Sequence, residues 1–496
     1  MPNSSSLRLL LPRLGIILAL APFLLLCAFN QPFFDDFRNG TWLREHGIWG
    51  VQVWLFKTWS GRFTTTFIMT ALNPVAYGWL GGVKLVSATL FVALWASLTH
   101  LLRALRWSPL GFSCSHSQAL WAAGLLLALF CNAAPAPFSF LYWFAGALVY
   151  QLTLISLLNF TALALRVGWG PATGRRWAAV GASMPLILAL TGNELTLVQA
   201  LPVLALLAVA LPRAARPALL GWLLLGALAV AGAAAAPGNW ARAAAMAPPT
   251  DPYYHYHWLV LIPRSVLSML LFLIKPMNGL SMLAAAAVGW WAAQSGWTTA
   301  PQPLSRRQWL ILLLAYAALN FIGFLLFRYL IVGAPLMRAQ NEILLVLLGS
   351  TAGLGWLGGR HFGRSSATES VELVLLSSRQ RPVRAWLLLL PLLGLFATGH
   401  VPEAWRELAT SAAPFDAQMR ARFATLRAAH RAGTPKVTLP PLRLPYGRVL
   451  IPLRQFSSDI EFDIDLTTGC EGNINGVMEN YFEVPHVCCE PDATLK

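Results

Sequence analysis

Apolar runs of about 20 residues recur along the whole chain and are separated by short polar segments. A helix of this length crosses the hydrocarbon core of a bilayer, which is about 30 Å thick. The pattern therefore predicts an all-α polytopic membrane protein with about eleven transmembrane helices. The predicted spans are residues 13–30, 80–102, 118–134, 141–165, 177–192, 195–212, 217–236, 277–294, 309–330, 341–358 and 385–399.

Two apolar segments do not fit this pattern. Segment 63–79 is interrupted by Asn73 and Pro74, so we expect either the start of the second span or a separate half-helix. Segment 257–275 contains Arg264 and Lys275 within an amphipathic pattern, which predicts a helix in the membrane interface. The first span follows Arg8 and Arg13, and we interpret it as an uncleaved span rather than a signal peptide.

The distribution of charge predicts the orientation of the spans. Only 11% of the residues are charged and 57% are hydrophobic, which excludes an ordinary soluble protein. The net charge of +16 is concentrated in alternate loops, as the positive-inside rule describes. We therefore expect a cytoplasmic N-terminus and a C-terminal region on the opposite side. The predicted cytoplasmic loops are residues 103–117, 166–176, 213–216, 295–308 and 359–384.

Residues 401–496 are mainly polar and predict a small extracytoplasmic α/β domain after a transmembrane domain of residues 1–400. The helical period continues to Gly433, and the alternation over residues 459–465 predicts a strand. We expect a solvated face rather than a metal site at the carboxylates of that strand, because alternate side chains diverge. Outside the cell, Cys470 is expected to pair with Cys488 or with Cys489.

The outer loop of residues 31–62 contains two adjacent carboxylates, Asp35 and Asp36, where the chain leaves the first span. Carboxylates at this position are costly to desolvate and usually have a function. The alternatives are a charged stop after the span or a structural cap for one of the pair. Four Trp residues with scattered charges follow and predict helices in the headgroup layer. We expect this loop to form the floor of an active site.

Other polar side chains of the predicted outer loops have the chemistry that such a site needs. Guanidinium groups bind phosphate through a fork of N–H donors, and a carboxylate accepts a hydroxyl proton. The alternative for an arginine is an anchor at a span end, and for Glu194 a helix cap. We expect the histidines to belong to the membrane interface rather than to a metal, since no third ligand is evident. These candidate residues are Arg62, Asn193, Glu194, Asn239, Arg242, His255, His257, Arg328 and Arg338.

Several short motifs occur together with this topology. They are Phe34-Asp35-Asp36-Phe37, Trp59-Ser60-Gly61-Arg62-Phe63, Asn193-Glu194, Pro237-Gly238-Asn239-Trp240-Ala241-Arg242 and, in the tail, Glu479-Asn480-Tyr481-Phe482. Together they resemble the GT-C superfamily of integral-membrane glycosyltransferases, and most closely an uncharacterised bacterial branch with an Asp-Asp first outer loop.

The resemblance implies an inverting transfer of a sugar from a polyprenyl-phosphate-type donor, outside the cytoplasm, at a bacterial cytoplasmic membrane. It implies that Asp35 or Asp36 serves as the catalytic base or orients the acceptor. The long soluble domain of protein-glycosylating members is missing, so a lipid or cell-surface glycan acceptor is expected. We expect Arg62, Arg242, Arg338 and Arg328 to hold the donor phosphate. Asn193, Glu194, Asn239, His255 and His257 are expected to bind substrate. No cofactor is expected, and a divalent cation is not required by the sequence.

Two other functions remain open. A transporter or flippase for a lipid-linked sugar would place ionisable residues at the bilayer midplane in paired halves, whereas the acids here gather at one surface. A glycan polymerase would use the same donor. The chain contains no Walker or dinucleotide-binding loop in the right context, which argues against an ATP-driven pump.

Overall fold

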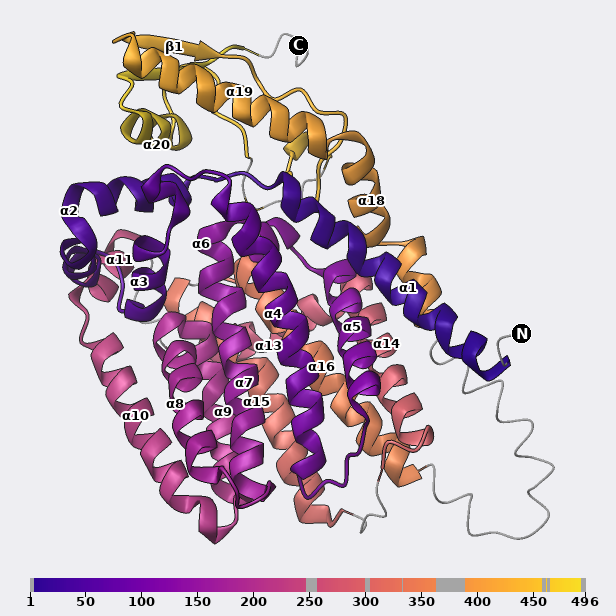
Figure 1. The fold of residues 1–496 in the computed structure, drawn as a ribbon. Coiled ribbons are helices and arrows are strands. Elements are labelled where there is room, and N and C mark those ends of the chain that lie inside the picture. Colours follow the sequence, from indigo (N-terminus) through magenta and orange to yellow (C-terminus); the bar gives the residue numbers. More distant parts are fainter. Residues whose placement is uncertain are drawn as a thin grey trace.

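The computed structural model describes residues 4–246, 257–298, 304–331, 333–362, 389–456, 461 and 464–491. Within these ranges the chain is mainly helical and contains one two-stranded sheet near the C-terminus (Figure 1). The α-helices are α1 (Ser4–Leu26), α2 (Asp35–Thr58), α3 (Phe63–Ala71), α4 (Gly82–Ala104), α5 (His116–Ala133), α6 (Phe144–Gly146), α7 (Leu152–Trp169), α8 (Arg175–Gly192), α9 (Glu194–Ala210), α10 (Arg216–Ala234), α11 (Pro237–Met246), α13 (Trp258–Leu273), α14 (Pro276–Gln294), α15 (Arg306–Ile331), α16 (Met337–Phe362), α18 (His400–Thr410), α19 (Ala412–Arg431) and α20 (Asn473–Phe482). The strands are β1 (Lys436–Leu439) and β2 (His486–Cys489), which pair in parallel.

Six helical segments of the described chain are long and apolar enough to cross a membrane, which supports a multi-pass all-α membrane protein. They are Leu10–Phe29, Gly82–Trp107, Phe144–Trp169, Arg213–Ala234, Arg306–Ile331 and Met337–Phe362. A seventh arises if α13 and α14, which are bent by 77° relative to each other, form one broken span. Other predicted spans fall on shorter helices such as α9, and residues 385–388 lie outside the described chain. The number eleven stays a prediction.

The loop after the first span forms a helical layer at one end of the bundle (Figure 1). α2 is kinked at Gly47, which has a φ of 67° that glycine adopts easily. α3 ends before Asn73, whose side chain accepts a hydrogen bond from the Val75 N–H at 3.0 Å and so caps a 3₁₀ turn, η2 (Pro74–Tyr77). Segment 63–79 is therefore a separate half-helix followed by a turn.

The C-terminal region packs directly on this layer (Figure 1). The ring of Phe37 in α2 lies 4.8 Å from that of Tyr481 and 5.5 Å from that of Phe423, measured between centroids. The Tyr481 hydroxyl donates to the carbonyl of Val75 at 2.7 Å, and Arg44 donates to the carbonyl of Tyr481 at 2.9 Å. The Glu-Asn-Tyr-Phe segment of the tail thus holds the C-terminal region against the loop of residues 31–62.

A fully buried carboxylate organises the loop that follows β1. The two oxygens of Glu407 accept four hydrogen bonds from the backbone N–H groups of residues 448–451, at 2.7 to 3.2 Å. Burial raises the pKa of Glu407 to about 7, and the four backbone donors act in the opposite direction.

The helical pattern that the sequence predicts up to Gly433 corresponds to the helices α18 and α19.

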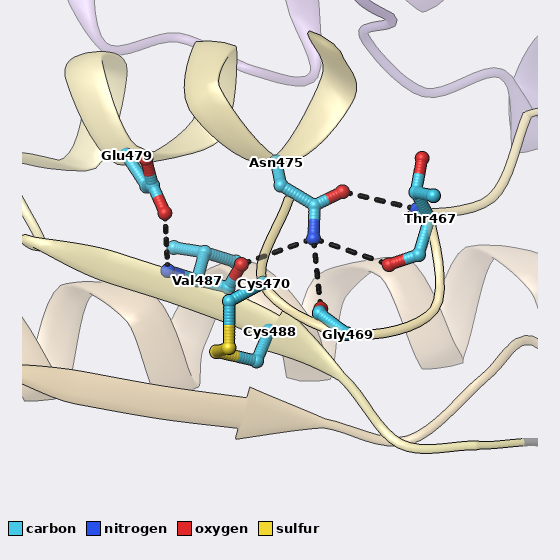
Figure 2. The surroundings of a disulfide bond; sticks show 7 residues. All are labelled: Thr467, Gly469, Cys470, Asn475, Glu479, Val487 and Cys488. Atoms are coloured by element: carbon cyan, nitrogen blue, oxygen red, sulfur yellow. Dashed lines mark hydrogen bonds between the residues drawn. A yellow bond between two sulfur atoms is a disulfide. The ribbon is translucent and has the colours of Figure 1, made fainter. Parts of the chain in front are cut away.

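The predicted alternatives for the disulfide are decided in favour of Cys470 and Cys488 (Figure 2). Beside it, Asn475 is fully buried, and its amide nitrogen donates to three backbone carbonyls at 3.0 to 3.2 Å, those of Thr467, Gly469 and Val487. The strand predicted over residues 459–465 is wrong at its described positions, since Glu461, Ile464 and Asp465 lie in bends. The remaining four residues of that segment lie outside the described chain.

Candidate functional site

Two loops that are far apart in the sequence pack backbone against backbone beside α2. The Gly61 N–H donates to Oδ1 of Asn239 at 2.9 Å, and Nδ2 of Asn239 donates to the carbonyl of Ala233 at 2.6 Å. A Cβ on Gly61 would collide with that carbonyl, and a Cβ on Gly238 would collide with the backbone of Trp59. Glycine is therefore required at both positions for this close approach.

This joint places Arg62 and Arg242 on opposite oxygens of the Glu194 carboxylate. Nε of Arg62 donates to Oε2 at 2.5 Å, and Nη2 of Arg242 donates to Oε1 at 2.9 Å. The side chains of Arg62, Arg242 and Glu194 are 25%, 18% and 28% exposed, so a ligand can reach them. The Thr65 hydroxyl donates to the carbonyl of Gly192 at 2.6 Å, which holds the Asn-Glu hairpin against α3. Three of the sequence motifs thus converge.

We call Arg62, Arg242 and Glu194 the clamp. Next to it lies a fully buried acid, Glu342 of α16. Nδ2 of Asn193 donates to one of its oxygens at 3.0 Å, and the hydroxyl of Thr196 donates to the other at 2.7 Å. Oδ1 of Asn193 also caps α9 by accepting from the Leu195 N–H at 3.1 Å. Asn193 therefore holds Glu194 in place, because it ties the hairpin to α16.

Asp36 is fully buried and its two oxygens are used for structure. One accepts from the Phe33 N–H at 2.9 Å and the other from the Ala145 N–H at 3.0 Å. Nδ2 of Asn73 donates to the Asp36 carbonyl at 2.7 Å. Burial raises the pKa of Asp36 well above its ordinary range, although the two backbone donors act against this. The geometry fits the structural role that the sequence left open for one of the two aspartates.

Asp35 differs from its neighbour in exposure and in partners. Its side chain is 22% exposed and forms an ion pair with Arg38, one helical turn further along α2. The Arg38 guanidinium lies over the rings of Phe34 and Trp42, at 4.8 Å and 5.1 Å from their centroids. Burial raises the pKa of Asp35, and the charges of Arg38 and Arg338 oppose this rise. Asp35 is thus a carboxylate within reach of ligands and under the influence of two guanidinium groups.

Tyr150 connects the two halves of the site. Its side chain lies within electrostatic range of both Arg338 and Arg242. It belongs to a buried π-helical segment, η5 (Ala147–Gln151), which also follows the Ala145 N–H that binds Asp36. Charges of both halves therefore form one network, which we call the outer charge network; it consists of Asp35, Arg38, Arg62, Tyr150, Glu194, Arg242, Arg338 and Glu461.

Glu461 brings the C-terminal region into the network. Its Oε1 lies 3.4 Å from Nη1 of Arg338, and its Oε2 accepts from the Arg338 backbone N–H at 3.2 Å. Burial raises the pKa of Glu461, which the charge of Arg338 opposes. Arg242 is also partly desolvated: burial and the neighbouring charge of Arg62 lower its pKa, while Glu194 raises it. The four arginines of the network thus face three carboxylates, Asp35, Glu194 and Glu461, which come from different parts of the chain.

The remaining predicted site residues have different surroundings. Asn239 serves the joint with Gly61. Arg328 donates through Nε and Nη2 to the Ser268 hydroxyl at 3.1 Å and 2.9 Å, which places it beside α13. His257 stacks on Trp258 with 6.2 Å between the ring centroids. His255 lies outside the described residues.

Sequence reasoning gave no site role to Arg38, Tyr150 or Glu461. Arg38 follows Asp35 by three residues, and this helical spacing was a usable signal for an ion pair. Tyr150 lies within an apolar run and Glu461 in a segment interpreted as a solvated strand, so neither carried such a signal.

Among the residues that the structure describes, no group of three His, Cys, Asp or Glu side chains is placed to hold a metal ion. Comparisons of the chain with protein-family models, with curated proteins and with solved structures find no match.

Proposed function

We propose that this chain is an inverting glycosyltransferase that moves a sugar from a polyprenyl-phosphate-type donor to a lipid or cell-surface glycan acceptor. The reaction takes place at the outer face of the cytoplasmic membrane. The observation that supports this is the outer charge network, in which the accessible carboxylate of Asp35 shares one set of charges with Arg242 and Arg62. The resemblance of the motifs to GT-C enzymes supports it as well.

The arginines of the clamp have the capacity to bind a donor phosphate. A guanidinium has five N–H donors, and the Glu194 contact uses one nitrogen of Arg242 and two of Arg62. The other donors remain for phosphate oxygens, and the partial desolvation of Arg242 strengthens such contacts. Glu194 keeps the two guanidinium groups close together before the donor arrives, so the clamp is preorganised for the negative charge that develops on the leaving phosphate.

Asp35 is the group we assign as the base, because Asp36 has no free carboxylate oxygen in the same geometry. The acceptor hydroxyl gives its proton to Asp35 as its oxygen forms a bond to the anomeric carbon. The bond between that carbon and the phosphate oxygen breaks, and the polyprenyl phosphate leaves with the bonding electrons. A pKa raised by burial makes the Asp35 carboxylate a stronger base. Arg242 and Arg62 stabilise the charge on the leaving phosphate.

The test is a transfer assay with the purified full chain in proteoliposomes. A panel of radiolabelled polyprenyl-phosphate pentoses and hexoses serves as donors, envelope lipids serve as acceptors, and new glycosidic products are separated by chromatography. Asp35→Asn is expected to lower the transfer rate by about 10²- to 10⁴-fold, the range typical of a lost general base. Glu45→Gln is the matched control, since this acid of α2 is 56% exposed and should change the rate by less than about twofold.

Full transfer by Asp35→Asn would contradict the mechanism. Movement of a labelled lipid across the bilayer without a new glycosidic bond would favour the transporter or flippase. Long products on a gel, instead of a single added sugar, would favour the glycan polymerase.

A further inference from the structure

A second cationic site lies apart from the outer charge network, between the start of α4 and the helix α19 that crosses above the bundle (Figure 1). It is a cavity of about 460 Å³, within the roughly 300–1,000 Å³ of typical small-molecule sites. The turn before α4 forms one wall with Gly78 and Gly81, and Phe423 of α19 lies on the other. This turn and α19 are more than 300 residues apart in the sequence.

Three cations line this cavity: Lys84, Arg420 and Arg427. The carboxylate of Asp416, which is 7% exposed, forms ion pairs with Lys84 and Arg420 and also accepts from the side chain of Gln31. Arg427 donates to the carbonyl of Gly78 at 3.5 Å, and within the described chain it makes no ion pair. Three cations therefore face one carboxylate, so the cavity has a surplus of positive charge.

The cavity lies at the level of a membrane surface. Lys84 belongs to the first turn of α4, which begins a candidate span, Gly82–Trp107. Tyr77 and Trp79 alternate with the lining residues of the turn and are 64% and 58% exposed. Exposed Tyr and Trp side chains at the end of a span are typical of the headgroup layer. Anionic lipid headgroups of this layer are therefore close to Arg420 and Arg427.

We propose that this cavity binds the phosphate group of a membrane-lipid headgroup. Asp416 orients Lys84 and Arg420, and Arg427 supplies a charge that no carboxylate of the described residues neutralises. A phosphate oxygen placed between them accepts charge-assisted hydrogen bonds from both arginines. This site tethers the C-terminal region to the membrane surface, and it does not depend on the transfer reaction proposed above.

The test measures the thermal unfolding midpoint of the purified full chain in a neutral detergent. Dioctanoyl phosphatidic acid, inorganic phosphate and dioctanoylglycerol, which has no phosphate, are titrated separately. Arg420→Gln with Arg427→Gln is compared with a double variant of equal charge, Arg431→Gln with Arg443→Gln, whose side chains are exposed and do not line the cavity. Arg427→Gln alone is a second variant, because it loses only one long hydrogen bond and should fold.

Phosphatidic acid should raise the midpoint, and dioctanoylglycerol should not. The apparent dissociation constant of phosphatidic acid should rise about tenfold or more in the Arg420/Arg427 variant and less than about twofold in the control variant. Binding should persist in Arg242→Gln, which separates this cavity from the outer charge network. Stabilisation by inorganic phosphate alone would overturn the lipid assignment in favour of a soluble phosphate. Equal affinities in the two double variants would overturn the site.

Discussion

The backbone N–H of Gly61 donates a hydrogen bond to the side-chain oxygen of Asn239, and this contact joins two loops that are 178 residues apart. The joint determines where the two arginines lie, since Arg62 directly follows Gly61 and Arg242 comes three residues after Asn239. The arrangement of the candidate phosphate-binding groups thus depends on a close approach that needs no Cβ at Gly61 and a side-chain acceptor at Asn239.

Replacing Gly61 by Ala is expected to lower the free energy of unfolding by about 1–3 kcal/mol, because the added Cβ collides with the carbonyl of Ala233. The measurement is the thermal unfolding midpoint in detergent. Gly221→Ala in α10 is the control, since open space surrounds that position and alanine favours a helix. An unchanged midpoint for Gly61→Ala would mean that the joint can open without cost.

Asp36→Asn is expected to destabilise the protein by about 1–3 kcal/mol, because the new NH₂ group faces a backbone N–H that has lost its acceptor. Asp35→Asn keeps its position on the surface of α2 and should shift the unfolding midpoint much less. Thermal unfolding of both variants under identical conditions tests the difference. Equal losses of stability in the two variants would refute the division of roles between these neighbours.

Glu194→Gln removes the negative charge between Arg62 and Arg242 and leaves two guanidinium groups facing each other. We expect a loss of stability of about 1–3 kcal/mol, since all three groups are partly buried. Millimolar inorganic phosphate should restore the midpoint more in this variant than in the wild type. Glu45→Gln, whose side chain is 56% exposed, is the control. A variant that phosphate does not stabilise would argue against the clamp as a phosphate site.

The pKa of Glu407, raised by burial to about 7, predicts a pH dependence of stability. Between pH 4.5 and about 7 the folded state holds a proton that the unfolded chain has released, so stability falls as the pH rises through this window. Full ionisation removes about 3 kcal/mol, at 1.36 kcal/mol for each pKa unit. We therefore expect the difference in stability between Glu407→Gln and the wild type to shift in favour of the variant as the pH rises from 5 to 7.5.

The measurement for Glu407 is the difference between the variant and wild-type midpoints at each pH, which cancels the contribution of other groups. Glu471→Gln is the control, because Glu471 is exposed. A difference that stays constant with pH would show that the four backbone donors keep Glu407 ionised throughout.

Several features followed from local sequence. The length of the apolar runs predicted a multi-pass helical protein, because the bilayer sets the length of a spanning helix. The break at Asn73 and Pro74 predicted the half-helix that α3 forms, one of two alternatives. The period up to Gly433 predicted the helices α18 and α19. Each of these properties depends on residues within a few turns of one another, so no distant contact was needed.

The roles of neighbouring residues depended on distant contacts, which periodicity does not report. Asp35 and Asp36 differ by about 100° in direction around α2. Only the tertiary structure decided that Asp36 turns inward, where it meets the Ala145 N–H from 109 residues away, and that Asp35 remains accessible. Likewise the sequence determined that acids and arginines occur in the predicted outer loops, while the packing of Gly61 on Ala233 and Asn239 decided which of them share a site.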